Sequence, residues 1–391
     1  MTIPLDRLVK KLDEGEIKRT ASGRTLFKLS SYEGNPIVKP QELGLTWYER
    51  GKLQVGAVFN GGATIFQGKV ILTPRCHWNY CKSKFFDPKL GKEKPCLENY
   101  VSEIWSLVSH DGIKFQRFRD VVIRGDGTDH RDFTYGIEDI RIVPHDRKYL
   151  LVGCGKVGPP FKASGGDRIA IYSTENFMDI TYHGMVSIFD SRNAIPFFID
   201  DETWLFLRFH PNIHLTLLEG GLNQLLNPFK HEERWIAIHQ RKEENLLLRA
   251  GEYPHEKEKI GPSTPLVKTP NGWLFLYHGV GEMSADVCRE YGLERGIDRG
   301  YSVCAALLDL DDPRQVLCRT KDPIFIPSKP YELGGDEEYQ VDTPAVVFPV
   351  GAIARNKKLL IYCGAGDKHV TLISCDLGKL VDYLLENCRL S

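Results

Sequence analysis

The sequence has no long hydrophobic run and almost no net charge. None of its apolar segments reaches the roughly 18 residues that a membrane-spanning helix needs, and the first twenty residues, MTIPLDRLVKKLDEGEIKRT, lack the apolar centre of a secretory leader. These absences predict a cytoplasmic protein with no membrane partner. The 51 basic and 52 acidic residues leave a formal charge of -1, so no overall field attracts nucleic acid.

The sequence also lacks the matched cysteine pairs that are typical of zinc sites. Most of its ten cysteines lie in apolar strand-like runs, as Cys304 does in YSVCAALLDL, and are expected to be small buried thiols. The segment CHWNYC places Cys76, His77 and Cys81 together, with Cys96 further along the chain, but no second pair follows. We therefore predict no metal site and no cofactor, and the role of this loop stays open.

Helical periodicity is scarce away from the two ends of the chain, and a repeated β-pattern takes its place. An apolar strand precedes each repeat, and at least one further candidate strand follows it, such as RIAIYST (168–174) or RWIAIHQ (234–240). Five such meanders predict an all-β protein, a single five-bladed β-propeller over residues 1–391. A pair of β-sandwiches is the alternative, although a sandwich does not need five copies of one pattern. The turn-plus-strand halves are FQGKVILTPR (66–75), HDRKYLLVGC (145–154), DDETWLFLRF (200–209), PNGWLFLYHG (270–279) and RNKKLLIYCG (355–364).

Short amphipathic helices are expected at the two ends, over residues 1–20 and 376–391. Because a closed propeller needs neither apolar stripe for its own blades, each stripe should cover either the outer strands of the same chain or another subunit. The stripes are Leu5, Leu8, Val9 and Leu12 in the first helix, and Leu377, Leu380, Val381, Leu384 and Leu385 in the second.

The most informative polar residues begin one of the predicted strands, in YGIEDIRIVPHDRKYLLVGCGK (135–156). Charges at the start of a buried strand are costly unless they are paired or used. Strand alternation would place Asp139 and Arg141 on one face, and Glu138 and Ile140 on the other. Since the first strand of each blade lines the channel of a propeller, Asp139 and Arg141 would point into an axial pocket. A structural ion pair between two blades is the alternative.

Other blades carry polar residues at corresponding positions, which are hard to explain as solvated surface. They are Asn60, Arg75, Arg192, Arg208, His278 and Asp367.

With these residues in view, the sequence resembles glycoside hydrolase family 130, the β-mannoside phosphorylases and their hydrolase relatives. The resemblance runs from NPIVKP (35–40) to GAGDKHVTLI (364–373). It implies a five-bladed β-propeller, a homo-oligomer, and the reversible, inverting phosphorolysis of a β-mannosyl oligosaccharide to α-mannose 1-phosphate and a sugar acceptor. Its most specific segments are KIGPSTPLVKTPNGWLFLYHGV (259–280), ALLDLDDP (306–313), AVVFPVG (345–351) and YCGAGD (362–367).

The resemblance also implies a role for individual residues. Asp139 falls on the single catalytic acid of the family. Ile140 stands where the family usually has proline, and residues 287–300 look like an insertion, so the acceptor sugar and the linkage stay open. The implied mannosyl-binding residues are Asn60, Arg75, Arg141 and Asp367, and the implied phosphate-binding residues are Arg192, Arg208, Lys259, His278 and Tyr301.

This set of residues suits a phosphorylase better than a hydrolase. An inverting glycosidase needs a second carboxylate to activate water, whereas phosphate is already a nucleophile and needs cations to bind it. Asp139 would need a pKa raised by burial and acidic neighbours in order to act as an acid. A β-mannosidase that uses water and a non-catalytic carbohydrate-binding propeller are the alternatives.

Overall fold

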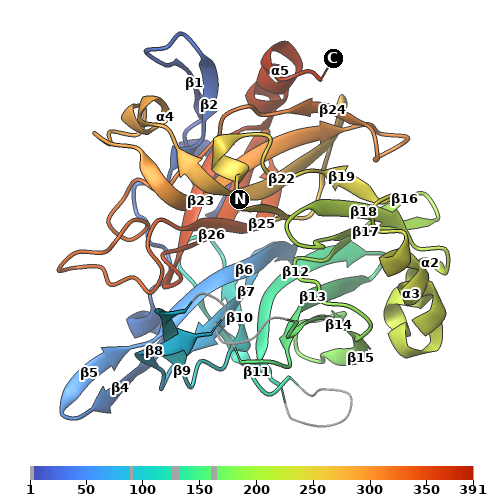
Figure 1. The fold of residues 1–391 in the computed structure, drawn as a ribbon, viewed down its shortest axis with the longest axis horizontal. Helices are drawn as coiled ribbons and strands as arrows, with labels where there is room; N and C mark the ends of the chain where they lie inside the picture. The colour runs from blue at the N-terminus through green and yellow to red at the C-terminus, as the bar shows by residue number, and fades with distance from the viewer. Residues whose placement is uncertain (1–3, 89–90, 126–132, 160–164, 391) are drawn as a thin grey trace.

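The computed structural model describes residues 4–88, 91–125, 133–159 and 165–390. Five antiparallel sheets surround a common axis, which confirms the predicted all-β, five-bladed propeller (Figure 1). The innermost strands β6, β12, β16, β20 and β25 lie closest to the axis, where β12 contacts β6, β16 and β25, and β6 contacts β25. Among the described residues, none of the helices combines the length and the apolar character needed to cross a bilayer.

The five blades follow one another along the chain. Blade 1 contains β6 (Ala57–Phe66), β7 (Lys69–His77), β10 (Glu103–Ser109) and β11 (Gln116–Ile123), and blade 2 contains β12 (Ile137–His145), β13 (Lys148–Lys156), β14 (Asp167–Thr174) and β15 (Thr181–Val186). Blade 3 contains β16 (Ile195–Ile199), β17 (Glu202–Leu207), β18 (Ile213–Leu217) and β19 (Leu246–Leu248). Blade 4 contains β20 (Lys259–Pro262), β21 (Val267–Thr269), β22 (Gly272–Met283), β23 (Ile297–Leu308) and β24 (Val316–Arg319).

Blade 5 joins the two ends of the chain. It contains β25 (Val347–Arg355), β26 (Lys358–Ala365) and β27 (His369–Asp376), and its fourth strand is β3 (Ser30–Ser31) from near the N-terminus. In the register of this pair, Ser30 lies opposite Ser374 and Ser31 opposite Ile373. The ring is therefore closed by hydrogen bonds between segments that are distant in the sequence.

Two-stranded hairpins and short helices decorate the ring. The hairpins are β1 (Glu16–Arg19) with β2 (Thr25–Lys28), β4 (Thr46–Glu49) with β5 (Lys52–Val55), and β8 (Cys81–Asp87) with β9 (Lys92–Glu98). The helices are α1 (Pro4–Lys11), α2 (Gly221–Leu226), α3 (Glu232–Gln240), α4 (Ala285–Arg289) and α5 (Leu377–Asn387), with 3-10 turns η1 (Pro40–Leu43), η2 (Pro228–His231) and η3 (Pro254–Glu256).

The core lies between neighbouring blades, where the aromatic residues of the repeated strands meet. Phe206 of blade 3 stacks on Phe275 of blade 4 with ring centres 4.4 Å apart and planes within 7°. Both side chains are fully buried, and burying an aromatic ring of this size stabilises the fold by about 1.5–3 kcal/mol. The recurring WLFL segments are thus explained by packing between blades.

One predicted strand is wrong. The segment RWIAIHQ (234–240) belongs to the helix α3, and the third strand of its blade is β18, from the segment IHLTL. Trp235 and Ile238, three residues apart, are the buried residues of this helix. Glu232 and Glu233 occupy its first turn, where negative charges interact favourably with the helix dipole and stabilise the helix. The short apolar run fits both periods, and the spacing of its buried residues is helical.

The terminal helices cover their own chain, which was one of the two alternatives. The N-terminal helix is shorter than the predicted range 1–20, because β1 begins at Glu16. Its residues Leu5, Leu8 and Val9 are buried in a cluster with Leu72 and Tyr362 of the blades. The C-terminal helix likewise occupies 377–387 and buries its stripe in a second such cluster. These stripes therefore give no support to a homo-oligomer, which stays a prediction.

Candidate active site

A cavity of about 380 Å³ lies on the propeller axis and receives residues from all five blades. Eight of the ten predicted site residues line it, namely Asn60, Arg75, Asp139, Arg192, Arg208, Lys259, Tyr301 and Asp367. The other lining residues are Tyr100, Glu138, Lys156, Asn193, Arg299, Thr343, Val346 and Phe348. The cavity is thus much richer in charged and amide side chains than the cores between the blades.

Left-handed backbone residues place several side chains in this cavity. Asn60 and Asp139 lie at φ +53° and +52°, each at an irregularity in the pairing of the innermost strand of its blade. Asn193 and Asp367 have the same sign of φ, at +61° and +51°. Asn and Asp are the non-glycine residues that adopt this conformation most readily, and such conformations cluster at functional sites.

Glycine makes room for one of these side chains. A Cβ atom at Gly364 would lie only 2.0 Å from the side-chain oxygen of Asn60, so no larger residue fits there without displacing it. The amide of Asn60 donates a hydrogen bond of 2.8 Å to Oδ1 of Asp139. Gly364 therefore leaves the space that the amide of Asn60 occupies, and this amide orients the candidate acid Asp139.

Two acids and two arginines form a buried cluster at the base of the cavity. Glu138 pairs with Arg75 at 2.7 Å and with Arg192 at 2.6 Å. Asp139 makes longer contacts with the same two residues, 3.5 Å to Nε of Arg75 and 3.0 Å to Nη2 of Arg192. Both carboxylates thus face both guanidinium groups, and Glu138 is held more closely than Asp139.

The predicted orientation of Glu138 is wrong. Strand alternation placed it on the face opposite Asp139, whereas both side chains face the cavity. The cause is the shift in pairing register between Glu138 and Arg141, together with the positive φ of Asp139. A bulge of this kind interrupts the two-residue period and redirects a side chain.

The arginines oppose the raised pKa that Asp139 would need in order to act as an acid. Burial alone would raise the pKa of this carboxyl, but the charges of Arg75, Arg192 and Arg141 outweigh burial and hold it well below its usual value. By contrast, burial raises the pKa of Asp367 against the lowering effect of Arg75. The three arginines therefore favour the ionised form of Asp139 at neutral pH.

A third acid restrains Arg192 from the other side. Oδ2 of Asp167 lies 3.7 Å from Nη1 of Arg192, and Lys156 forms an ion pair with the same carboxylate. Burial opposes ionisation of Asp167, but the charges of Arg192 and Lys156 lower its pKa to about 2. Arg192 consequently has three carboxylate neighbours in this structure.

Arg208 and Lys259 differ from Arg192, because no carboxylate of the described residues forms an ion pair with either. Nε of Arg208 has no hydrogen-bond partner among the described residues. Lys259 lies over the ring of Tyr301, with Nζ 5.1 Å from the ring centre. Burial and neighbouring arginine charges lower the pKa of both residues. These two cations are partly buried and available to an anion, which would offset the cost of removing their charges from water.

Arg141 and His278 do not line the cavity but lie behind it. Arg141 donates to the main-chain oxygens of Asp139 at 2.7 Å, of Pro262 at 3.2 Å and of Ser263 at 3.0 Å. It therefore ties the bulge that carries the acid to blade 4 across the axis. His278 is fully buried, and its Nδ1 lies 3.0 Å from the hydroxyl of Ser263. Both residues are placed to position the site rather than to touch a ligand in it.

Six polar residues of the cavity were not among the predicted site residues, and one of them, Lys156, had a clear signal in the sequence. The six are Tyr100, Glu138, Lys156, Asn193, Arg299 and Thr343. Lys156 ends the apolar run YLLVGCGK, just as Arg208 ends WLFLR, so a charge terminating a buried strand was a usable indication. Arg299 falls inside the segment 287–300 that was interpreted as an insertion. Asn193, directly after Arg192, has a buried Nδ2 without a partner among the described residues.

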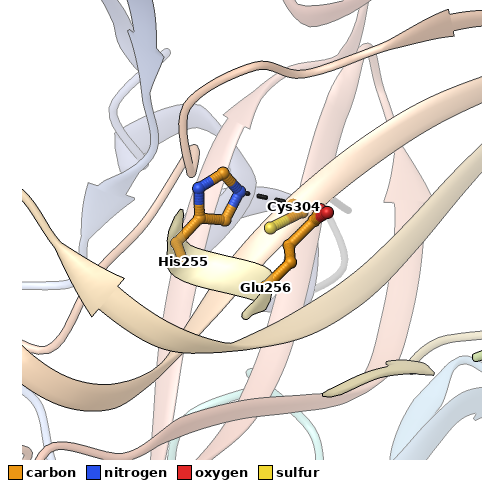
Figure 2. Close-up of side chains that lie close together, drawn as sticks. All are labelled: His255, Glu256 and Cys304. Atoms are coloured by element: carbon orange, nitrogen blue, oxygen red, sulfur yellow. Dashed lines mark ion pairs between the residues drawn. The ribbon is translucent and has the colours of Figure 1, made fainter. Parts of the chain in front are cut away.

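A second buried polar group lies outside the cavity, at blade 4. Figure 2 shows His255, Glu256 and Cys304 close together, with their potential metal-ligand atoms within 4.8 Å of one another. Both oxygens of Glu256 are already in use, because one accepts from Tyr277 at 2.7 Å and the other from Arg319 at 2.5 Å. The group is part of a hydrogen-bonded ion-pair network that links β22 and β24 to the turn η3, and the absence of a metal site stays a prediction.

Comparison with known proteins agrees with this geometry. The model of glycoside hydrolase family 130, described as β-1,4-mannooligosaccharide phosphorylase, matches residues 33–386. The chain belongs to this family. A β-1,2-mannobiose phosphorylase of Thermoanaerobacter sp. (strain X514) is 28% identical to it over 352 residues, which cover 88% of this chain and 96% of the relative.

Solved structures of family members share the fold. The β-1,2-mannobiose phosphorylase of Listeria innocua, in complex with β-1,2-mannobiose, superposes with a TM-score of 0.64 at 21% identity, covering 91% of this chain and 99% of the other. A structure reported with family hydrolases that target β-1,2 mannosidic linkages in Candida mannan has a TM-score of 0.62 at 20% identity, with 88% and 93% covered. At these identities the likeness supports the propeller fold alone.

Proposed function

We propose that this chain catalyses the reversible, inverting phosphorolysis of a β-mannoside, giving α-mannose 1-phosphate and a free sugar acceptor. The observation that carries the proposal is the pair Arg208 and Lys259. These two partly buried cations form no ion pair with a carboxylate of the described residues and lie in the same cavity as the candidate acid. A dianion would satisfy both, and the neutral sugars would meet no opposing charge.

In the proposed reaction, an oxygen of phosphate attacks the anomeric carbon from the face opposite the acceptor. The bond from that carbon to the glycosidic oxygen breaks, and its electron pair stays with the departing oxygen. Asp139 supplies the proton that this oxygen takes up and becomes a carboxylate. Attack from the opposite face converts the β-mannoside into the α-phosphate, and the reverse steps transfer mannose to an acceptor.

The other cavity residues have matching parts in this proposal. Asn60, Arg75 and Asp367 would hold the mannosyl unit, with the amide of Asn60 also orienting Asp139. Arg192, Arg208, Lys259 and Tyr301 would bind phosphate. Arg141 and His278 lie behind the cavity, so their part would be to hold Asp139 and blade 4 in place. No cofactor besides phosphate is needed, and a cytoplasmic homo-oligomer remains part of the expectation.

Hydrolysis is the second candidate, and the observation that favours it is the buried carboxyl of Asp367 in the same cavity. A water-using enzyme needs a base of this kind, although the raised pKa of Asp367 suits a base less well than an ionised carboxylate would. Glu138 is less suited to that role, because both of its oxygens are held by arginines.

A panel of β-mannosyl disaccharides with and without phosphate separates the two reactions. Relatives that match most of this chain are named as β-1,2-mannobiose phosphorylases, so β-1,2-mannobiose is the first substrate to test, followed by β-1,4-linked compounds with mannose, glucose or N-acetylglucosamine as acceptor. Phosphate-dependent mannose 1-phosphate supports the proposal. Free mannose formed equally without phosphate indicates a hydrolase, and no product from any substrate favours a binding protein.

A further inference from the structure

Asp139 forms ion pairs with arginines, which favour its carboxylate, yet the proposed reaction requires it to carry a proton. Its carboxylate lies among three arginines, and the closest of their side-chain contacts is the 3.0 Å ion pair between Oδ2 and Nη2 of Arg192. The other oxygen, Oδ1, accepts from the amide of Asn60 at 2.8 Å. Oδ2 can therefore take a proton only when Arg192 releases it.

Arg192 is also one of the cations beside the anion site. It lines the same cavity as Arg208 and Lys259, and its positive charge helps to lower the pKa of both residues. Arg192 thus has three carboxylate neighbours and shares its cavity with two cations that form no ion pair with a carboxylate of the described residues. An anion that binds among the three cations competes with Asp139 for Arg192.

We propose that Arg192 couples anion binding to proton loading: phosphate draws Arg192 away from Asp139, and the released oxygen of Asp139 takes up one proton from solvent. This inference rests on the phosphorolysis proposed above and assigns Arg192 a positioning role toward the acid in addition to its contact with phosphate. The balance is simple, since one ion pair breaks, one forms and one proton enters from the buffer. Asp139 therefore carries its proton only when the phosphate nucleophile is bound.

Glu138 explains why the proton goes to Asp139. Glu138 keeps the shorter contacts, 2.7 Å to Arg75 and 2.6 Å to Arg192, whereas Asp139 has the longer ones. When the anion draws on Arg192, Asp139 loses its closer partner and keeps only the 3.5 Å contact with Arg75, while Glu138 retains its 2.7 Å contact with Arg75. The negative charge of Glu138, now closer to being unbalanced, also disfavours ionisation of its neighbour. The charged and titratable groups that influence Asp139 are Arg75, His77, Glu138, Arg141, Arg192, His278 and Asp367.

Sulfate is the probe that tests this coupling. It is a dianion that does not titrate near neutral pH, so any proton taken up when it binds belongs to the protein. Calorimetric titration with sulfate in buffers of different ionisation enthalpy measures that uptake directly. We expect uptake approaching one proton per bound sulfate in wild type, and an affinity that rises by up to about tenfold for each unit that the pH falls. An affinity independent of pH, with no proton uptake, overturns the coupling.

Two isosteric variants identify the group that takes the proton. Asp139→Asn should still bind sulfate but without proton uptake. Glu138→Gln should keep part of the uptake, because it removes a charge that disfavours ionisation of Asp139 but leaves the carboxyl that takes the proton. Uptake that persists in Asp139→Asn assigns the proton to another group, such as Lys259, and overturns the inference.

The same experiment separates this inference from the proposed function. Sulfate binding without proton uptake removes only the coupling, and mannose 1-phosphate can still be formed. A wild-type protein that binds neither sulfate nor phosphate overturns both, because the cation pair would then not be an anion site.

Discussion

Replacement of Asp139 by Asn tests the role of the acid, and the structure allows the size of the effect to be estimated. The substitution keeps the shape of the side chain and its acceptor for the amide of Asn60, but it removes the transferable proton. General acid catalysis contributes about 10²–10⁴-fold, so the loss of transition-state stabilisation should be about 3–5 kcal/mol. Glu138 still balances Arg75 and Arg192, so the variant should fold.

The assay should compare two leaving groups. With a β-mannosyl disaccharide the sugar oxygen must be protonated as it leaves, and phosphorolysis by Asp139→Asn should fall by the full factor. A nitrophenyl β-mannoside releases a stable anion without protonation, so its phosphorolysis should fall much less. Near-ultraviolet circular dichroism of the variant controls for folding. Activity within about tenfold of wild type toward the disaccharide, or an equal loss for both substrates, would refute the role of Asp139 as general acid.

Three further predictions concern the anion site, the buried network and the N-terminal helix. Arg208→Ala and Lys259→Ala should each raise the KM for phosphate by roughly 10- to 150-fold, which corresponds to about 1.5–3 kcal/mol, with the affinity for mannoside unchanged; an unaltered phosphate KM in both would place the anion elsewhere. Arg319→Met should cost about 3–5 kcal/mol of unfolding free energy by urea titration at about pH 8. The cost should be less at about pH 6, because burial raises the pKa of Glu256 to about 7 and a protonated Glu256 no longer needs its partner; equal costs at both pH values would contradict this. Deletion of residues 1–15 should lower Tm by removing Leu5 and Leu8 from the core; a deletion that changes the mass measured by light scattering but leaves Tm unchanged would instead make the helix an interface.

The fold could be predicted from local patterns because each blade is a repeated local unit. The WLFL-type strands and their turns recur along the chain, and their count gives the number of blades. The closing strand β3 could not be found in this way, since two serines have no strand signal and their pairing with β27 depends on the complete ring. The helix α3 was misassigned because seven residues with few polar positions fit both periods.

The sequence allowed most residues of the candidate site to be predicted, but not the orientation of Glu138 or the ionisation of Asp139. Polar residues that end apolar runs, such as Arg75 and Arg208, lie in the cavity as expected. The side of the strand on which Glu138 lies depends on the backbone conformation of Asp139, which alternation cannot indicate. The ionisation of Asp139 depends on Arg75 and Arg192 from two other parts of the chain, and only the assembled propeller brings these charges within a few ångströms of it.

Phosphorus NMR of a single reaction tests the central claim most directly. The protein is incubated with β-1,2-mannobiose and inorganic phosphate, and the consumption of phosphate and the appearance of the sugar phosphate are followed in time. The account predicts mannose 1-phosphate of α configuration, one for each mannose released as acceptor, and no reaction when phosphate is omitted. If the disaccharide is instead cleaved to two free mannose molecules at the same rate with and without phosphate, the cation-rich pocket is not a phosphate site and the account is contradicted.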